Sequence, residues 1–173
     1  MSTIWWENIK GVDLSQGDYL ENCPVIIIPD DPDLSVEQIS DVIVEERNLI
    51  IMTQSCDLAQ NKAKSIAMCP IYTLDELSKK NPSYLNNRAW EPVRQGRVEG
   101  WHMLGGFLGF DNSQALVVDF RQIYSLPVNF LRAFVSKSNK RARLKSPYLE
   151  HTAQSFARFF MRVGLPTSID QFK

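Results

Sequence analysis

Two short apolar runs separated by a polar loop constrain the fold of this chain most strongly. Leu49 to Met52 form the first run and Ile66 to Cys69 form the second, which Pro70 closes. Continuous apolar runs of this length, bounded by turn residues, are typical of buried strands. The first run ends in a polar cluster that is a candidate binding or catalytic site, although a core strand followed by a polar turn explains it equally well. The cluster consists of Thr53, Gln54, Ser55, Cys56 and Asp57.

The surrounding sequence predicts further short strands. Residues 36–46 fit helical spacing, but their β-branched density favours a strand at 39–45, joined by a hairpin through residues 46–48 to a strand at 49–54. Residues 65–72, 100–104 and 115–120 are also predicted as strands, and a short helix begins at Leu74 and ends at Asn81-Pro82. We therefore expect five to six short strands within residues 17–126.

The last third of the chain predicts two amphipathic helices. Pro127 suits the first position of a helix whose apolar face consists of Phe130, Leu131, Phe134 and Val135. Ser146-Pro147 begins a second helix that runs to about Val163, with Phe156 and Phe160 in its buried stripe and His151, Gln154 and Arg158 near another face. The prediction is an α+β fold in one domain, residues 1–173, with a small β-barrel core at 17–126 and a helical extension at 127–173.

Composition excludes several classes of protein. Apolar residues make up 44% of the chain and charged residues 23%, as in soluble globular proteins. No apolar run approaches the ~18 residues that span a bilayer, so we expect a cytoplasmic protein without a membrane segment. The three cysteines have no CxxC spacing and the chain has two histidines, so neither a metal site nor a cofactor is expected. Cys23 and Cys69 are predicted to be buried.

Charge is distributed very unevenly along the chain. Residues 1–60 carry 2 basic and 12 acidic side chains, residues 61–126 carry 8 and 6, and residues 127–173 carry 9 and 2, which together give the net charge of −1. The basic residues concentrate in the run 137–145, which contains five cations and no acid: Lys137, Lys140, Arg141, Arg143 and Lys145. Such a run predicts either an RNA-binding surface or internal neutralisation by the acidic N-terminal part, and the sequence leaves both open.

Two further residues invite a chemical interpretation. His102 follows Trp101 in a predicted strand, where it serves either as a structural histidine or as a base-stacking group. Cys56 is adjacent to Asp57, whose charge would raise the pKa of the thiol, so we expect Cys56 to serve local geometry and not nucleophilic attack.

The middle of the chain resembles the PemK/MazF family, small SH3-like barrels of bacterial toxin–antitoxin systems. The resemblance begins at Gly17-Asp18 and continues through the strand from Arg47 to Thr53, the segment Cys69-Pro70-Ile71-Tyr72-Thr73, and Val118 to Ile123. It spans about residues 17–126. Asn48 stands where the family has proline, and Tyr72 where it has threonine.

The resemblance implies a metal-independent endoribonuclease that acts on single-stranded RNA, in a toxin–antitoxin or antiviral (phage-defence) system. It implies that Arg47 stabilises charge in the transition state and that the hydroxyl of Thr73 orients the phosphate. The alternative is a non-catalytic adaptor or regulatory subunit that binds a protein partner, and a thiol enzyme built on Cys56 ranks third. A homodimer is a further expectation.

Overall fold

A computed structural model describes residues 5–28, 43–106, 115–137 and 141–161 of the 173-residue chain. Within these ranges the fold is mixed α and β, so the predicted α+β class is confirmed. The strands are β1 (Trp6–Ile9), β2 (Asp18–Ile27), β3 (Ile43–Ile51), β4 (Ser65–Thr73), β5 (Trp101–Leu104), β6 (Leu116–Asp119), β7 (Tyr124–Pro127) and β8 (Arg141–Leu144). The helices are α1 (Ser55–Ala59), α2 (Leu74–Lys80), α3 (Glu91–Arg94), α4 (Val128–Ser136) and α5 (Tyr148–Phe160), with 3₁₀ turns η2 (Pro82–Leu85) and η3 (Asn87–Trp90).

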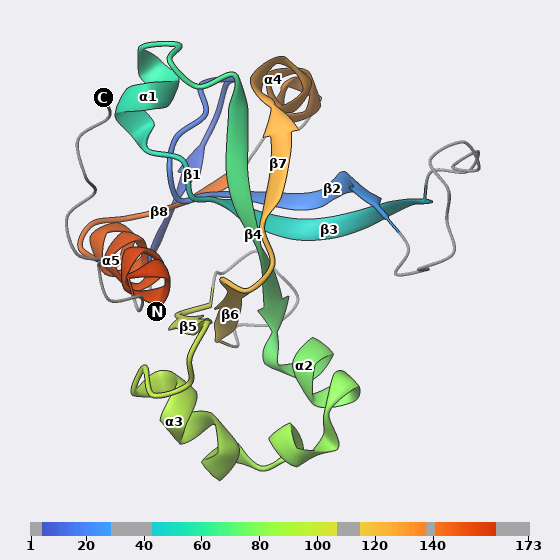
Figure 1. Cartoon of the computed structure of the whole chain (residues 1–173), viewed down its shortest axis with the longest axis vertical. Helices are drawn as coiled ribbons and strands as arrows, with labels where there is room; N and C mark the ends of the chain where they lie inside the picture. Colours follow the sequence, from blue (N-terminus) through green and yellow to red (C-terminus); the bar gives the residue numbers. More distant parts are fainter. Residues whose placement is uncertain (1–4, 29–42, 107–114, 138–140, 162–173) are drawn as a thin grey trace, which may run out of the picture.

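The strands form one antiparallel sheet in the order β1-β8-β2-β3-β4-β6-β5, with β7 paired to β4. Strand β4 is central: β3 and β7 flank its first part, and β6 pairs with its last residues, Ile71 to Thr73. The small closed barrel expected from the sequence is not confirmed, because over the described ranges the sheet is open, with β1 and β5 as its terminal strands. Figure 1 shows β4 running from beside α1 and α4 to the start of α2 and crossing the β2–β3 ribbon.

The predicted hairpin through residues 46–48 is wrong, because these residues lie inside one continuous strand, Ile43–Ile51. Strand β3 pairs with β2 from Tyr19↔Ile50 to Ile27↔Ile43, with a bulge between Leu20 and Cys23 opposite Asn48, so the pairing resumes on both sides of the polar residues. Much of this two-stranded ribbon is exposed, as at Val44, and an exposed ribbon accepts polar side chains without turning. Residues 39–42 of the predicted strand lie outside the described residues.

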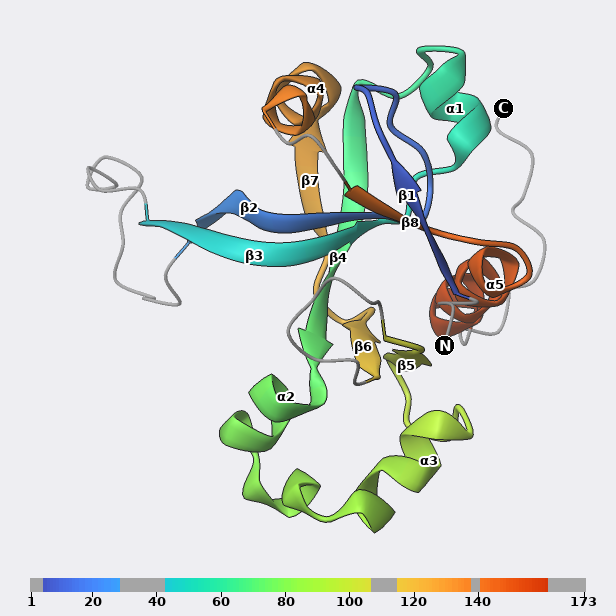
Figure 2. The same cartoon turned by 180° about the vertical axis from the view of Figure 1, so that it is seen from behind.

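Helices α4 and α5 cover two separate parts of the sheet. Helix α4 buries Leu131 and Val135 against a core that includes Leu49 and Ile66. Helix α5 packs Phe156 and its neighbours against a second core around Ile50 and Val118. Figure 2 shows that α4 and α5 lie at different places on the sheet, and that the segment from α2 to α3 projects beyond the end of β4. Both C-terminal helices predicted from the sequence are therefore confirmed.

Phe160 was expected to be buried, and this expectation is wrong. Its side chain is 51% exposed, whereas Phe156 is half-buried and packs edge-on against Phe120 with ring centroids 5.4 Å apart. Helix α5 ends at Phe160, so the ring contacts Phe156 and Phe159 and faces solvent beyond them.

We expect Phe160→Ala to lower the free energy of unfolding by no more than about 1 kcal/mol, because little apolar area returns to water. Phe156→Ala is expected to cost about 2–3 kcal/mol, since it removes a ring packed on the sheet. Urea unfolding of the two variants checks the order. Equal losses would contradict it.

Candidate functional site

Arg47 and Thr73, which the family resemblance implies as catalytic, lie on neighbouring strands with their polar groups already engaged. The guanidinium of Arg47 forms an ion pair with Glu45, although its Nε is buried without a hydrogen-bond partner in the described part of the chain. The hydroxyl of Thr73 donates to Glu76 Oε2 at 2.9 Å and accepts from the Glu76 backbone N–H at 3.1 Å. Thr73 therefore serves as the N-cap of α2, in a capping box.

The residue beside Arg47 is Tyr72. The β3–β4 pairing ends at Leu49 and Pro70, and the charge of Arg47 acts on Tyr72 just beyond it, whereas Thr73 points to the other face of β4. Burial raises the pKa of the Tyr72 phenol, and the charge of Arg47 opposes that rise. The Tyr72 hydroxyl bonds Gln122 Oε1 at 3.3 Å, and Lys80 Nζ lies 4.4 Å from the ring centroid.

The polar cluster after β3 has a structural role. Thr53 Oγ1 accepts a hydrogen bond from the Ala67 backbone N–H at 2.8 Å, which ties the strand exit to β4. Ser55 Oγ lies 2.6 Å from Ser15 Oγ and accepts from the backbone N–H of Gln16 at 3.1 Å. Residue Gln54 precedes α1, which contains Cys56 and Asp57. Thr53 and Ser55 therefore hold the strand exit and the N-terminal arm in place, and a binding role for Gln54, Cys56 and Asp57 stays a prediction.

The cysteines divide as the sequence indicates. Cys23 and Cys69 are fully buried, and burial raises the pKa of the Cys23 thiol to about 11 and that of Cys69 to about 12. Cys56 is exposed, and its Sγ lies 3.6 Å from Gln54 Oε1 and 3.9 Å from Asp57 Oδ1. The burial of Cys23 and Cys69 is confirmed, and the local role of Cys56 stays a prediction.

Two arginines of the basic run converge on a single buried carboxylate. Asp18 is fully buried, and its Oδ2 accepts from Arg141 Nε at 2.9 Å and from Arg143 Nη2 at 3.0 Å. Arg141 is itself buried and also donates to the carbonyls of Gly11 and Asp13. The hydrogen bond to Asp18 raises the pKa of Arg143. For these two arginines the structure thus shows internal neutralisation by the acidic N-terminal part.

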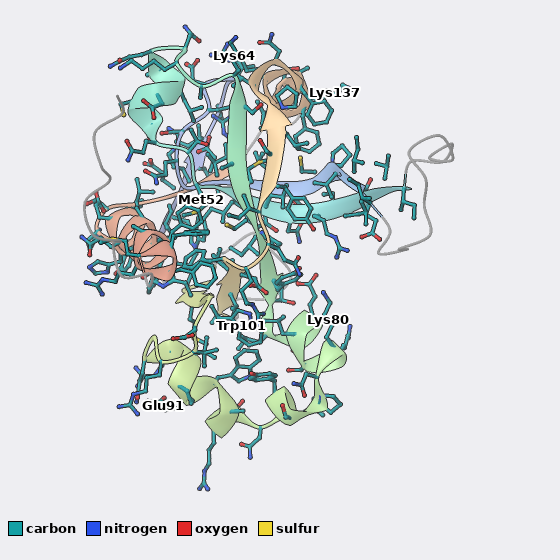
Figure 3. All side chains as sticks on the ribbon, in the orientation of Figure 1. Met52, Lys64, Lys80, Glu91, Trp101 and Lys137 are labelled. Atoms are coloured by element: carbon teal, nitrogen blue, oxygen red, sulfur yellow. The ribbon has the colours of Figure 1, made fainter. Side chains whose placement is uncertain are left out.

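The remaining cations of the run are placed differently. Lys137 follows α4 and Lys145 follows β8, and both are exposed. Lys140 lies outside the described residues. Figure 3 shows Lys137 at α4, on the part of the molecule away from Trp101. RNA binding by Lys137 and Lys145 stays a prediction.

Both histidines of the chain line one cavity of about 390 Å³ between α3, β5 and α5. His102 projects from β5 and His151 from α5, with Arg94 and Arg158 on the same walls. An adjoining cavity, also about 390 Å³, has the aromatic residues Trp101 and Phe159 in its wall. The two cavities share Gln95, Gly96, His102, Ser155 and Arg158, so we treat them as one site, the α3–α5 cleft.

The environment of His102 makes it neutral at pH 7. Burial, together with the charge of nearby His151, lowers the pKa of His102 to about 4. The His102 ring stacks on Phe120, with centroids 6.0 Å apart and an interplanar angle of 18°. His151 is exposed. The imidazole of His102 is therefore oriented by packing, whereas that of His151 is open to solvent.

The arginines of the cleft differ in what holds them. Arg94 makes a bidentate pair with Glu91, Nε to Oε2 at 2.8 Å and Nη2 to Oε1 at 2.5 Å, and the hydrogen bond from Arg94 lowers the pKa of Glu91 to about 2. Arg158 is exposed on α5 and lies on the same face of the helix as His151, two turns further along. Among the described residues no acidic side chain lines the first cavity, and Glu99 lines the second.

Sequence reasoning identified His102 and not its partner. The spacing of His151, Gln154 and Arg158 shows that they share a helix face, but only the tertiary fold brings that face to β5. A polar face containing a histidine and an arginine on an otherwise apolar helix was the available signal.

Comparison with known proteins finds no protein-family model, curated protein or solved structure that matches this chain. In the described ranges no helix has the length and apolar character needed to cross a bilayer. Over the same ranges, histidine, cysteine and carboxylate side chains do not gather in groups of three or more that could hold a metal ion.

Proposed function

We propose that this protein binds single-stranded RNA in the α3–α5 cleft, as a PemK/MazF-like protein of a bacterial toxin–antitoxin or phage-defence system. One observation carries the proposal: two arginines and both histidines line a single cavity. The guanidinium fork of Arg158 can match the geometry of phosphate oxygens, whereas the fork of Arg94 is already held by Glu91.

The adjoining cavity supports RNA over other phosphate ligands. Phe159 lines this cavity next to the arginines, and unstacked RNA bases pack on such side chains, whereas the Trp101 ring already packs against Tyr84 and Trp90. Arg121 lies 5.2 Å from the Trp101 ring centroid and covers part of that ring. If a base packs in this second cavity, its phosphate would lie near His102 and Arg158, which line both cavities.

The family assignment remains part of the proposal. Strands β2, β3, β4 and β6 contain the residues of the PemK/MazF resemblance and lie side by side in the sheet, which supports a common origin with the SH3-like barrels. A cytoplasmic location agrees with an RNA ligand.

A non-catalytic adaptor that binds a protein partner is the second candidate. It is favoured by the engagement of Thr73 in the cap of α2 and of Arg47 with Glu45, which leaves the family's catalytic pair without its expected chemistry.

Fluorescence anisotropy with a labelled single-stranded RNA of mixed sequence, measured over a salt series, tests the proposal. Arg158→Gln is expected to weaken binding and to reduce the slope of log affinity against log salt by about 0.7, which is the contribution of one phosphate contact. Arg88→Gln, a change at an exposed arginine of η3 outside the cleft, is the matched control. Binding that responds equally to both changes, or to neither, would contradict the site.

The double variant Lys137→Gln, Lys145→Gln examines the basic run in the same assay. We expect a smaller salt slope without loss of stability, because both side chains are exposed. An unchanged salt slope would show that Lys137 and Lys145 do not contact the RNA.

A further inference from the structure

We propose that His102 and His151 act as a general base and a general acid that cleave RNA bound in the α3–α5 cleft. The inference rests on the proposed RNA binding and adds a reaction to it. It assigns the chemistry to two histidines rather than to Arg47 and Thr73.

The geometry supplies two imidazoles on facing elements of one concave site. His102 is fixed on β5 by stacking with Phe120, and His151 stands on the exposed face of α5. A phosphodiester between them meets the guanidinium of Arg158, which can neutralise the charge that develops on the phosphorane. Acid–base catalysis of this kind needs a donor and an acceptor on opposite sides of the reacting phosphorus, and two elements that face each other across a cavity can provide them.

The reaction is an internal transesterification. The 2′-oxygen of the ribose attacks the adjacent phosphorus, and its proton passes to the neutral imidazole of His102. The bond from phosphorus to the 5′-oxygen breaks as protonated His151 donates a proton to that oxygen. The products are a 2′,3′-cyclic phosphate and a 5′-hydroxyl. No electrons are lost or gained, and the two histidines exchange protonation states, which solvent then restores.

The charges around His102 suit this role once RNA is bound. Burial and the charge of His151 depress the pKa of His102, which makes it a weak base. A bound phosphodiester anion favours the protonated imidazole and so raises that pKa towards neutrality. The other charged groups around the cleft are Glu91, Arg94, Arg97 and Glu99 from the α3 segment, Asp119 and Arg121 from the end of β6, and Arg158 from α5.

Four of these charges form two ion pairs. Glu91 is neutralised by Arg94, and Asp119 pairs with Arg121 at 2.6 Å. Neither carboxylate therefore competes strongly with the imidazoles for the reacting proton.

The test uses purified full-length protein, a labelled single-stranded RNA and EDTA, with product ends analysed for cyclic phosphate. We expect the wild type to cleave, and His102→Gln and His151→Gln each to lose at least 100-fold in rate while the RNA dissociation constant changes by less than about threefold. A DNA oligonucleotide of the same sequence should bind without being cut, because it has no 2′-hydroxyl. Rate against pH should be bell-shaped in the wild type, and each variant should lose one limb.

The controls separate failure of catalysis from failure of binding. Circular dichroism checks folding of His102→Gln, and His151→Gln at an exposed position gives an independent measurement. Wild-type protein that binds RNA without cutting it, a His151→Gln variant that cuts at the wild-type rate, or cleavage lost only in Arg47→Ala would each overturn the histidine pair and leave RNA binding standing. Absence of RNA binding would overturn the proposed function itself.

Discussion

Replacing Asp18 by asparagine is expected to lower the free energy of unfolding by about 3–5 kcal/mol, the usual cost of removing one partner from a buried ion pair. Asp18 is fully buried and accepts hydrogen bonds from both Arg141 and Arg143. The asparagine leaves Arg141 buried at 6% side-chain exposure with no counter-charge, which is the costly part of the change. Chemical denaturation at neutral pH measures the loss.

Glu21→Gln is the matched control for this change. It removes a carboxylate from the same strand, β2, at an exposed position. We expect its stability to stay within about 0.5 kcal/mol of the wild type. If both variants lost the same amount, the effect would come from net charge and the buried carboxylate would have no special role.

Acid should destabilise the wild type more than a His102→Gln variant. The pKa of His102 is about 4 in the folded protein against an ordinary value of 6.5, so the folded state disfavours the proton. The contribution of His102 to the free energy of unfolding is complete above pH 6.5 and is lost as the pH falls from 6.5 through 4. The loss between pH 7 and pH 4 amounts to about 3 kcal/mol, from about 1.4 kcal/mol per pKa unit.

Urea unfolding at several pH values isolates this effect by difference, since carboxylate titrations are common to all variants. The free energy of unfolding of His102→Gln should fall by about 3 kcal/mol less than that of the wild type between pH 7 and pH 4. His151→Gln should keep most of the wild-type pH dependence, because burial of His102 is the main cause of its pKa shift. Parallel curves for wild type and His102→Gln would show that His102 titrates as it does in water.

Local signals predicted the elements that local interactions define. Strand β4 agrees with the apolar run that Pro70 interrupts, and α2 begins where Thr73 and Glu76 form a capping box. Helices α4 and α5 follow their apolar periodicity, although Pro127 ends β7 and precedes the first turn of α4. In each of these cases residues a few positions apart decide the conformation, so a sequence pattern suffices.

Long-range contacts decide the features that the sequence left open or mispredicted. The polar residues around Arg47 resemble a turn, but pairing with β2 keeps them extended. Arg141 and Arg143 resemble a solvated cationic loop, yet they form a strand whose charges meet Asp18. The α3–α5 cleft also depends on long-range contacts, because His102 and His151 become neighbours only when α5 packs beside β5. None of these contacts has a signature in sequence spacing.

The position of β8 between β1 and β2 has a consequence for the order in which the molecule assembles. Asp18 and Arg141 are 123 residues apart, and among the described strands β1 joins the sheet through its pairing with β8. During synthesis, β2, β3 and β4 can pair as soon as they emerge. Strand β1 stays unpaired until β8 has been made, and Asp18 lacks its arginine partners until then. Until β8 arrives, this edge of β2 is unpaired, and an unpaired edge can pair with another extended chain.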